Sequence, residues 1–425
     1  MEAEALLNLA RKRSISELEI YQVRSHSNPV CFEANQLKQI ESNQATGIAL
    51  RLWQDGCPGL AVAYGDFNPE ELIDKALAIS ALNPPETPLL NEENRLIYPA
   101  TESPLDIQEL ISQGRSAIAL LRVKNPDIIC NLDLEKEQET TTLINSRGLY
   151  CQHTDISLSA SIGVEWVREE DFLGIYDGIY SHQKLDLTKI VKSVEQRLEW
   201  AKKIGQITVQ KMPVLFTPNA VTTLWETVND ALNSKRVLDK SSPWHNSHGK
   251  QVISPILSIS QQADLQPYNC PFDDEGTVTT NYNLIESGVI TNFYCDKFHS
   301  DKLGITNTGN GFRPSLSSYP TPALVNLVVK NGDTSWDELV GNIEYGLIVD
   351  QILGNDADIS GDFSLNVDLG YLVEKGEIIG RVKDTMIAGN VYQALKQVQG
   401  LGNDNNWSGS CYTPSMVIDS LSVIS

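Results

Sequence analysis

The sequence has few cysteines, a deficit of positive charge and no long apolar run. Its seven cysteines are scattered singly over 425 residues, with no CxxC pair, which argues against a disulfide framework or a structural zinc site. No stretch approaches the roughly 18 consecutive apolar residues of a membrane span. Residues 1–7 carry acid where a signal peptide carries base. We therefore expect a cytoplasmic protein with no membrane partner.

The shortage of lysine and arginine sets a second limit. There are 33 basic and 55 acidic residues, for a formal net charge of −22. Such a chain repels phosphate backbones, so we expect no direct binding of nucleic acid. Apolar residues at 41% and charged residues at 21% are ordinary for a folded protein. The length suits about two to three domains.

Hairpin and helix signals alternate in the first half. Residues 47–64 alternate in polarity around Asp55-Gly56, which predicts a β-hairpin. Asn68-Pro69 predicts the start of a helix whose buried stripe is Leu72, Ile73, Ala76 and Leu77. Further elements are expected along this half: a helix over about 105–122, strands over 126–180 and a helix over 187–204.

The pattern changes near residue 208. Residues 214–216 predict a buried strand, and Asn219 is the expected cap of a helix that runs to about Asn233. Beyond it the chain is strand-rich with frequent glycines. We predict an α+β fold: an N-terminal α/β domain with hairpins and helices over 1–207, and a C-terminal strand-rich mixed β domain over 208–425 with one long helix near its start.

Three glycine-punctuated runs in the second half carry the most information. They are Cys270-Pro-Phe-Asp-Asp-Glu-Gly276-Thr, Leu284 to Tyr294, and Asn307-Thr-Gly-Asn-Gly311. Within the second, Glu286-Ser287-Gly288 predicts a hairpin turn. With Ser360-Gly-Asp-Phe-Ser364, Ile387-Ala-Gly-Asn390 and the Cys411 region in the same order, the second half resembles the C-terminal domain of the TldD/PmbA family. That family comprises zinc peptidases and their partner subunits, historically called modulators of DNA gyrase.

The resemblance implies a zinc-binding HExxxH motif on the first helix of that domain, with a C-terminal cysteine as a further ligand. The matching helix here is Thr223-Leu-Trp-Glu-Thr-Val-Asn-Asp-Ala231-Leu. Either Trp225 and Asp230, or Glu226 and Ala231, stand where the histidines belong. No histidine occurs between 219 and 234 under either placement. The chain is therefore similar to the PmbA (TldE) branch, which lacks the motif, and we expect no zinc or other cofactor.

The weak catalytic candidates are Glu226, Asp230 and Cys411. Glu226 and Asp230 are four residues apart and share one helix face, where a solvated acidic face is the simpler interpretation. Cys411 matches the family's cysteine ligand in position. It is most simply a structural or vestigial residue, since a nucleophile would need a neighbouring base. Trp225 is expected in the core. His245 and His248 are expected in a surface loop, and the other four histidines have no discernible partner.

The resemblance implies a function in proteolysis of unfolded or extended polypeptides. The main hypothesis is a zinc-less partner subunit that dimerises with a TldD-like peptidase, or with itself, and binds peptide by β-strand addition. One alternative is an independent peptidase with a rearranged site. Another is a peptide-binding or assembly module without chemistry. Whether the chain is itself an enzyme stays open at this stage.

Overall fold

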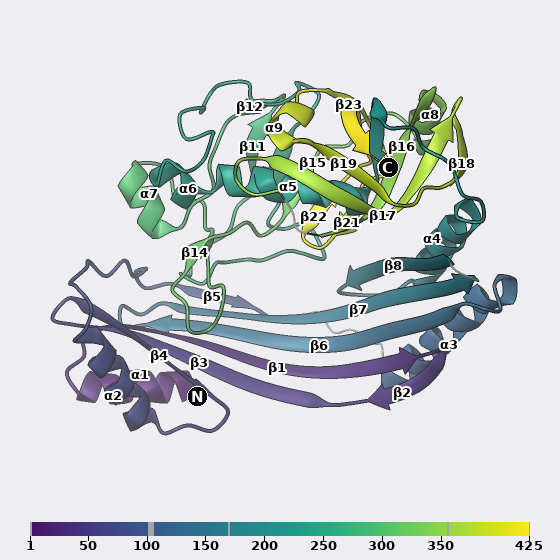
Figure 1. Ribbon diagram of the computed structural model, residues 1–425. Helices are drawn as coiled ribbons and strands as arrows, with labels where there is room; N and C mark the ends of the chain where they lie inside the picture. Colours follow the sequence, from purple (N-terminus) through teal and green to yellow (C-terminus); the bar gives the residue numbers. More distant parts are fainter. Residues whose placement is uncertain (1, 101–105, 169–170, 355–356, 425) are drawn as a thin grey trace.

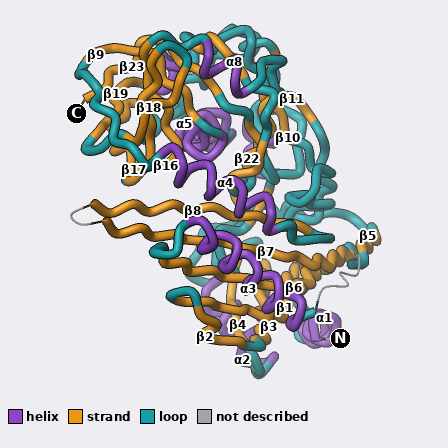
Figure 2. Tube along the Cα trace, turned by 90° about the vertical axis from the view of Figure 1, so that its right-hand side faces the viewer, coloured by secondary structure: helices purple, strands orange, loops and turns teal. Residues whose placement is uncertain are grey.

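The computed structural model describes residues 2–100, 106–168, 171–354 and 357–424. The chain forms an α+β fold, as predicted. A long curved sheet built from the first half lies beneath a more compact C-terminal body (Figure 1). Figure 2, turned by 90°, shows helix α5 end-on inside that body.

The large sheet has eight strands in the order β4-β3-β1-β6-β7-β5, with β2 on β1 and β8 on β7. All pairs are antiparallel except β5 with β7. The predicted hairpin at Asp55-Gly56 is confirmed, and both turn residues have positive φ. The strands are β1 (Glu17–Glu33), β2 (Gln36–Ile40), β3 (Asn43–Gln54), β4 (Cys57–Tyr64), β5 (Arg95–Tyr98), β6 (Ile129–Asn145), β7 (Tyr150–Arg168) and β8 (Asp171–Ser181).

Four helices accompany this sheet, in pairs at its two ends (Figure 1). They are α1 (Glu2–Lys12), α2 (Pro69–Ser80), α3 (Ile107–Lys124) and α4 (Leu187–Trp200). The expected start of α2 is confirmed, because the Asn68 side chain accepts a hydrogen bond from the Glu70 amide. Leu77 is half-buried rather than buried. The third helix of the sequence prediction ends at Trp200, not near 204, and residues 101–105 lie outside the described part of the chain.

The C-terminal body contains a closed ring of five strands, β16-β9-β23-β19-β17, in which β17 pairs back with β16. Strands β18 and β20 extend it. Closure leaves no free edge within the ring itself. These strands are β9 (Gln210–Phe216), β16 (Tyr345–Leu353), β17 (Asp362–Glu374), β18 (Glu377–Arg381), β19 (Thr385–Asn390), β20 (Val398–Leu401) and β23 (Met416–Ile424).

A second sheet in the body has the order β12-β11-β10-β15-β22-β21. The predicted turn at Ser287-Gly288 joins β11 to β12, and both residues have positive φ. The members are β10 (Ile259–Gln261), β11 (Tyr282–Glu286), β12 (Val289–Ile290), β15 (Leu327–Val329), β21 (Asn406–Ser408) and β22 (Cys411–Thr413). The remaining elements are β13 (Gly311–Phe312), β14 (Thr321–Pro322), α6 (Ser234–Leu238), α7 (Lys297–Leu303), α8 (Trp336–Gly341) and α9 (Val391–Ala394).

Helix α5 (Pro218–Leu232) is the long helix that the sequence predicts. Its cap is Thr217, whose side chain accepts from the Ala220 amide, and not Asn219 as expected. Pro218 takes the first helical position, where its missing N–H costs nothing. Nine of its residues are buried, and the seven apolar ones among them pack in the core of the body. The narrow face of α5 that lies toward the large sheet is not part of this core.

The two halves share apolar contacts. Leu132 and Ile190 belong to the same buried cluster as Leu215, Ile348 and Tyr371. The division at 207/208 therefore stays a prediction. All seven cysteines are free. Over the described ranges, no helix is both long and apolar enough to cross a membrane.

Candidate functional site

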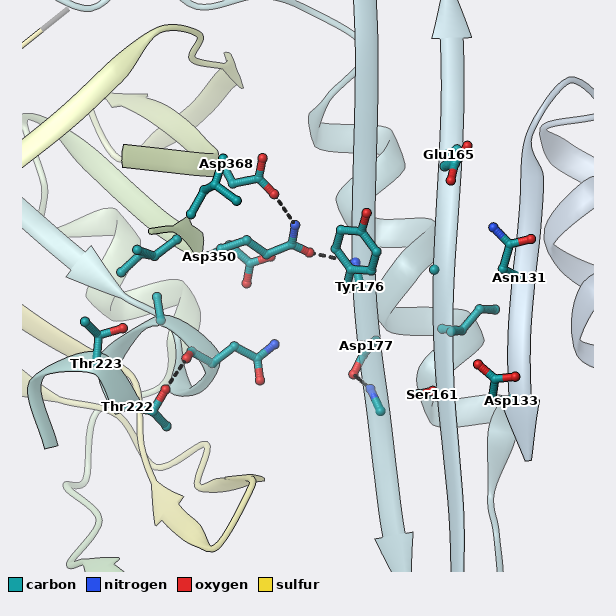
Figure 3. Close-up of a pocket in the computed structure, with 18 of the residues that line it drawn as sticks. Asn131, Asp133, Ser161, Glu165, Tyr176, Asp177, Thr222, Thr223, Asp350 and Asp368 are labelled. Atoms are coloured by element: carbon teal, nitrogen blue, oxygen red, sulfur yellow. Dashed lines mark hydrogen bonds between the residues drawn. The ribbon is translucent and has the colours of Figure 1, made fainter. Parts of the chain in front are cut away.

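A groove of about 720 Å³ lies between the large sheet and the C-terminal body. Strands β6, β7 and β8 form one wall, and α5 with the end of β16 forms the other (Figure 3). Polar residues of the sheet wall are Asn131, Asp133, Ser161, Glu165, Tyr176 and Asp177. Those of the body wall are Asn219, Thr222, Thr223, Glu226, Asp350, Gln351 and Asp368.

A second hollow, of about 860 Å³, adjoins the groove at Asn219 and Asp350. Its lining includes Trp200 and Trp336, whose rings stack with centroids 5.8 Å apart. The open space therefore continues past the first turn of α5. Together the two hollows offer room for a ligand longer than a single residue.

The groove is acidic. Among the described residues that line it, six are carboxylates and none is lysine or arginine: Asp133, Glu165, Asp177, Glu226, Asp350 and Asp368. Walls of one charge sign concentrate ligands of the opposite sign. The groove thus disfavours anionic ligands and suits neutral or cationic ones.

Arg197 stands behind the groove wall and balances part of this charge. Its Nη1 lies 3.1 Å from Asp177 Oδ2 and its Nε 3.0 Å from Asp350 Oδ2. Burial raises the pKa of Asp350, and the nearby guanidinium opposes that rise. Nη1 also donates to the Tyr176 carbonyl oxygen at 3.1 Å. Arg197 therefore joins α4, β8 and β16 in one buried contact.

A β-bulge in β16 directs two side chains toward the groove. The register of β16 against β17 shifts on both sides of Gln351. Such bulges bend a strand and redirect its side chains, often next to functional sites. Here Asp350 and Gln351 both point to the groove wall instead of following the regular alternation of β16.

Helix α5 presents Thr222, Thr223 and Glu226 to the groove. The expectation that Trp225 lies in the core agrees with its 1% exposure. Its indole Nε1 donates to Thr413 Oγ1 at 2.9 Å. Under the first placement of the family motif, the position of the first histidine is therefore filled by a core side chain.

The structure brings Glu226 and Cys411 together, although 185 positions separate them in the sequence. Burial, and then the negative charge of Glu226, raises the pKa of the Cys411 thiol to about 12. The thiol is consequently protonated at neutral pH, which is the unreactive form of cysteine. No cation or imidazole contributes to this shift in the described residues.

Asp230 does not join Glu226 in the groove. Its carboxylate lies 3.1 Å from the guanidinium of Arg236, and both side chains are more than 40% exposed. The pair is a surface ion pair of small energetic value. Of the three weak candidates, Glu226 and Cys411 share one place and Asp230 lies elsewhere.

Among the described residues, no histidine lines the groove. His245 Nδ1 and His248 Nε2 each lie 2.8 Å from a backbone carbonyl oxygen in a loop, as expected for a surface pair. Three of the four single histidines do have polar partners, contrary to expectation, and the first is His26, whose Nε2 lies 3.1 Å from Ser42 Oγ. His299 Nδ1 is 2.7 Å from Asp296 Oδ1, and His182 Nε2 is 3.3 Å from Asp155 Oδ1. Asp296 and His299 are only three residues apart at the start of α7, whereas His182, just after β8, meets Asp155 inside β7 only once the chain is folded.

A catalytic zinc ion takes three protein ligands and leaves one position open. In the described parts of the chain, no three His, Cys, Asp or Glu side chains gather closely enough to hold a metal ion. Beside α5 the donors are the Glu226 carboxylate and a protonated Cys411 thiol, whereas metal binding takes thiolate. These residues do not fit a zinc site of the HExxxH type. That the purified chain carries no zinc stays a prediction.

The glycine-punctuated runs lie at another place, where they fasten loops to one another. The Asp273 carboxylate accepts hydrogen bonds from the amides of Glu275, Thr277 and Gly311 at 2.8–3.0 Å. The Glu275 carboxylate accepts from the Lys297 amide at 2.9 Å. Burial raises the pKa of Glu275 to about 7, and burial with the neighbouring Glu275 raises that of Asp273.

These loops are also tied to the large sheet. Glu19 on β1 is buried and pairs with both Arg51 on β3 and Arg313 beside β13. The side-chain amide of Asn91 donates to the Glu275 carbonyl oxygen at 2.8 Å. The first of these runs thus joins the two halves and is bonded to the third, and none of the three lines the groove.

Sequence reasoning missed most of the groove. Tyr176, Asp350 and Gln351 come from β8 and the bulge of β16, Arg197 behind them comes from α4, and no motif marks any of these residues. A carboxylate at position 350 inside an otherwise apolar strand was the available signal, since a buried charge needs a partner. That signal does not reveal that Arg197 is the partner of Asp350, nor that the two lie beside a groove.

Comparison with known proteins agrees with this architecture. Residues 209–425 match the PmbA/TldA metallopeptidase C-terminal domain, and residues 18–80 match domain 1 of the same metallopeptidases. An uncharacterized protein of Methanocaldococcus jannaschii is 26% identical over 430 residues, 98% of each chain. The metalloprotease PmbA of Escherichia coli O157:H7 is 28% identical over 221 residues, 50% of this chain and 47% of that protein.

The solved structure of TldE from Thermococcus kodakarensis has the same fold. It superposes with a TM-score of 0.89 at 24% identity, over 99% of both chains. One family model spans half of the sequence, and the fold neighbour spans nearly all of it. The chain therefore belongs to the PmbA/TldD metallopeptidase family.

Proposed function

We propose that this chain is a PmbA/TldE-like partner subunit without zinc, which supports proteolysis of unfolded or extended peptides by a TldD-like subunit. Because the chain belongs to a metallopeptidase family, the reaction that we connect it with is peptide hydrolysis. The partner role is inferred from what this chain places at the family's site. We place it in the cytoplasm, with no membrane or direct nucleic-acid partner.

The observation that carries the proposal is the groove face of α5. Peptide hydrolysis by zinc needs ligands for the metal and a carboxylate to manage the proton of the bound water. Thr222, Thr223 and Glu226 face the groove, and the sequence has no histidine between 219 and 234. One carboxylate is present, but the imidazoles that would hold the ion beside it are not.

The thiol beside it argues against an independent peptidase. A cysteine nucleophile works as thiolate and is normally activated by a cation or an imidazole. The pKa of Cys411 is instead raised to about 12 by burial and by Glu226. This environment suits a retained, inert side chain better than a rearranged catalytic site.

The groove itself suits an extended chain. It holds about 720 Å³, adjoins a further 860 Å³ and carries carboxylates on both walls. A site of this size can accept several residues of an unfolded segment, whereas a folded domain cannot enter it. In a dimer, the groove would hold peptide while the TldD-like subunit supplies the chemistry.

The proposal is tested by peptidase assays on the chain alone, on a TldD-like chain bearing HExxxH alone, and on the mixture. Unfolded casein is the substrate, and co-purification of the two chains is measured in parallel. We expect the chain alone to be inactive and the mixture to exceed the sum of its parts. Metal-dependent hydrolysis by this chain alone would overturn the proposal. Peptide binding without any co-purifying partner would favour a binding module instead.

A further inference from the structure

The outer edge of β8 has no neighbouring strand in the described chain, since β8 pairs with β7 alone. Unpaired edges carry backbone N–H and C=O groups that can template another strand. On β8 these groups belong to every second residue from Phe172 to Gly178. Tyr176 and Gly178 also line the groove, so the edge borders the proposed peptide site.

Side chains from the rest of the molecule occupy this edge one after another. Arg381 Nη1 donates to the Phe172 carbonyl oxygen at 3.0 Å. Arg197 Nη1 donates to the Tyr176 carbonyl oxygen at 3.1 Å. Both arginines are at least 90% buried and are held by carboxylates. They are fixed parts of the fold.

Gln351 fills the gap between them in a different way. Its Oε1 accepts from the Tyr176 amide at 2.7 Å, and its Nε2 donates to the Gly174 carbonyl oxygen at 3.2 Å. A residue of a parallel strand makes the same two bonds, one to each neighbour of the residue that it faces. The side-chain amide thus stands where one residue of a parallel strand would pair opposite Ile175.

Gln351 is also the side chain that a bound peptide could displace from the β8 edge. It is half-buried, it lies in the bulge of β16, and it lines the groove. Its Nε2 already lies 3.3 Å from Asp368 Oδ2, an exposed carboxylate on β17. A small rotation toward Asp368 would free the Tyr176 amide and the Gly174 carbonyl without leaving the glutamine amide unpaired.

We propose that the β8 edge at Gly174–Tyr176 is a pairing site for an extended peptide running parallel to β8, and that Gln351 occupies it in the free protein. This inference rests on the proposed function and specifies where its peptide binds. Peptide entry exchanges the two bonds of Gln351 for two backbone bonds. The flanking arginines limit the site to about one residue of pairing, since they hold the adjacent carbonyls.

The test measures binding of a short fluorescein-labelled peptide of alternating alanine and lysine, chosen to suit the acidic groove, to the chain alone. A second probe has the same sequence with every backbone nitrogen methylated, which removes the N–H donors from both edges of the strand but keeps the side chains. The variants are Gln351→Ala and Gln351→Met, with Gln397→Ala as an exposed glutamine control away from the groove. Hydrogen exchange at the Tyr176 amide reports on the edge directly.

We expect both Gln351 variants to bind the unmethylated peptide about two- to tenfold more tightly, the range that the net free energy of one hydrogen bond gives. The methylated peptide should bind weakly to every form. Exchange at Tyr176 should be faster in the variants and slower again with peptide. If Gln351→Ala lowers stability, hydrogen exchange at the Tyr176 amide of the wild type still tests the pairing site, because bound peptide should slow it.

Equal affinity in wild type and variants, or equal affinity for the methylated peptide, would overturn the pairing site while leaving the partner role intact. Failure of both peptides to bind any form would overturn it as well. Conversely, if the mixture with a TldD-like chain shows no added peptidase activity, the proposed function fails while these affinities stay the same.

Discussion

The side chains beside α5 decide what chemistry the groove permits. Cys411 is held between apolar packing and the Glu226 carboxylate, and both keep its thiol protonated. Trp225 fills the interior and bonds to Thr413 on the same strand as Cys411. The local environment therefore stabilises neutral side chains, and no group of three metal ligands occurs in the described part of the chain.

Replacing Glu226 by glutamine tests this environment. Removing the negative charge should lower the pKa of Cys411, so its alkylation by iodoacetamide at mildly alkaline pH should accelerate by about two- to tenfold. Peptide mass spectrometry resolves Cys411 from the other six cysteines. Asp230→Asn is the matched control, since Asp230 pairs with Arg236, and it should leave the rate unchanged. A thiol that reacts fast in the wild type would contradict the account.

Some residue-level properties follow from the sequence and others do not. The burial of Trp225 follows from its place in an apolar helical stripe. The pairing of Arg197 with Asp177 and Asp350 does not, because the partners are brought together only by the packing of α4, β8 and β16. The same holds for Gln351 and the β8 edge.

At the scale of elements, turns position the strands of the C-terminal body. The β11–β12 turn needs left-handed backbone at Ser287 and Gly288. Gly288 also approaches another segment closely, since a Cβ there would lie 2.5 Å from the Ile253 carbonyl oxygen. Glycine is therefore required for two separate reasons, conformation and space.

The two reasons can be separated by substitution. Gly249 has similar positive φ, but a Cβ there would meet no atom within 4 Å. We expect Gly249→Ala to destabilise the chain by roughly 1 kcal/mol, the cost of left-handed backbone. Gly288→Ala should cost roughly 1–3 kcal/mol more, because neighbouring backbone must move. Urea unfolding of both variants measures the difference. Equal costs would show that the close approach is unimportant.

Elements with strong local signals were predictable. The hairpin at Asp55-Gly56, the start of α2 and the turn at Gly288 all follow from residues adjacent in sequence. The cap of α5 was misplaced by two positions because Asn219 is a good capping residue, yet Pro218 already occupies the first turn. The bulge at Gln351 has no local signature, since it arises from pairing with β17.

At the scale of the whole molecule, a buried ionic joint holds the sheet and the body together. Glu19, Arg51 and Arg313 pair across the two halves, and Glu275 lies beside them with its pKa raised to about 7 by burial. A carboxyl group whose pKa is higher in the folded state stabilises the fold fully below its unfolded pKa. That contribution is lost as pH rises through the folded pKa.

The joint should therefore weaken between pH 4.5, the ordinary pKa of glutamate, and about pH 7. Glu275→Gln removes a titrating group and also a negative charge that raises the pKa of Asp273. We expect the variant to lose less stability than the wild type over this window, measured by urea unfolding at several pH values. Glu286→Gln, at an exposed turn position, is the control. Parallel curves for wild type and Glu275→Gln would contradict the account.

The groove belongs to this largest scale, which is why so little of it was foreseen. Its walls come from β6–β8, α5 and β16, and their facing surfaces exist only once the halves pack together. The sequence did indicate the family, the α+β class and the missing histidines of α5. It could not indicate that an acidic sheet wall and the β8 edge would face that helix.

The zinc content of the purified chain decides whether the site beside α5 can hold a catalytic metal ion. The chain is equilibrated with zinc, freed of unbound ion and analysed by mass spectrometry, with Cys411→Ala alongside. Because α5 offers the groove a carboxylate and two hydroxyls but no imidazole, we expect substoichiometric zinc in both proteins. One zinc ion per chain, lost on Cys411→Ala, would show that the chain holds zinc with Cys411 and would refute the role of a zinc-less partner subunit.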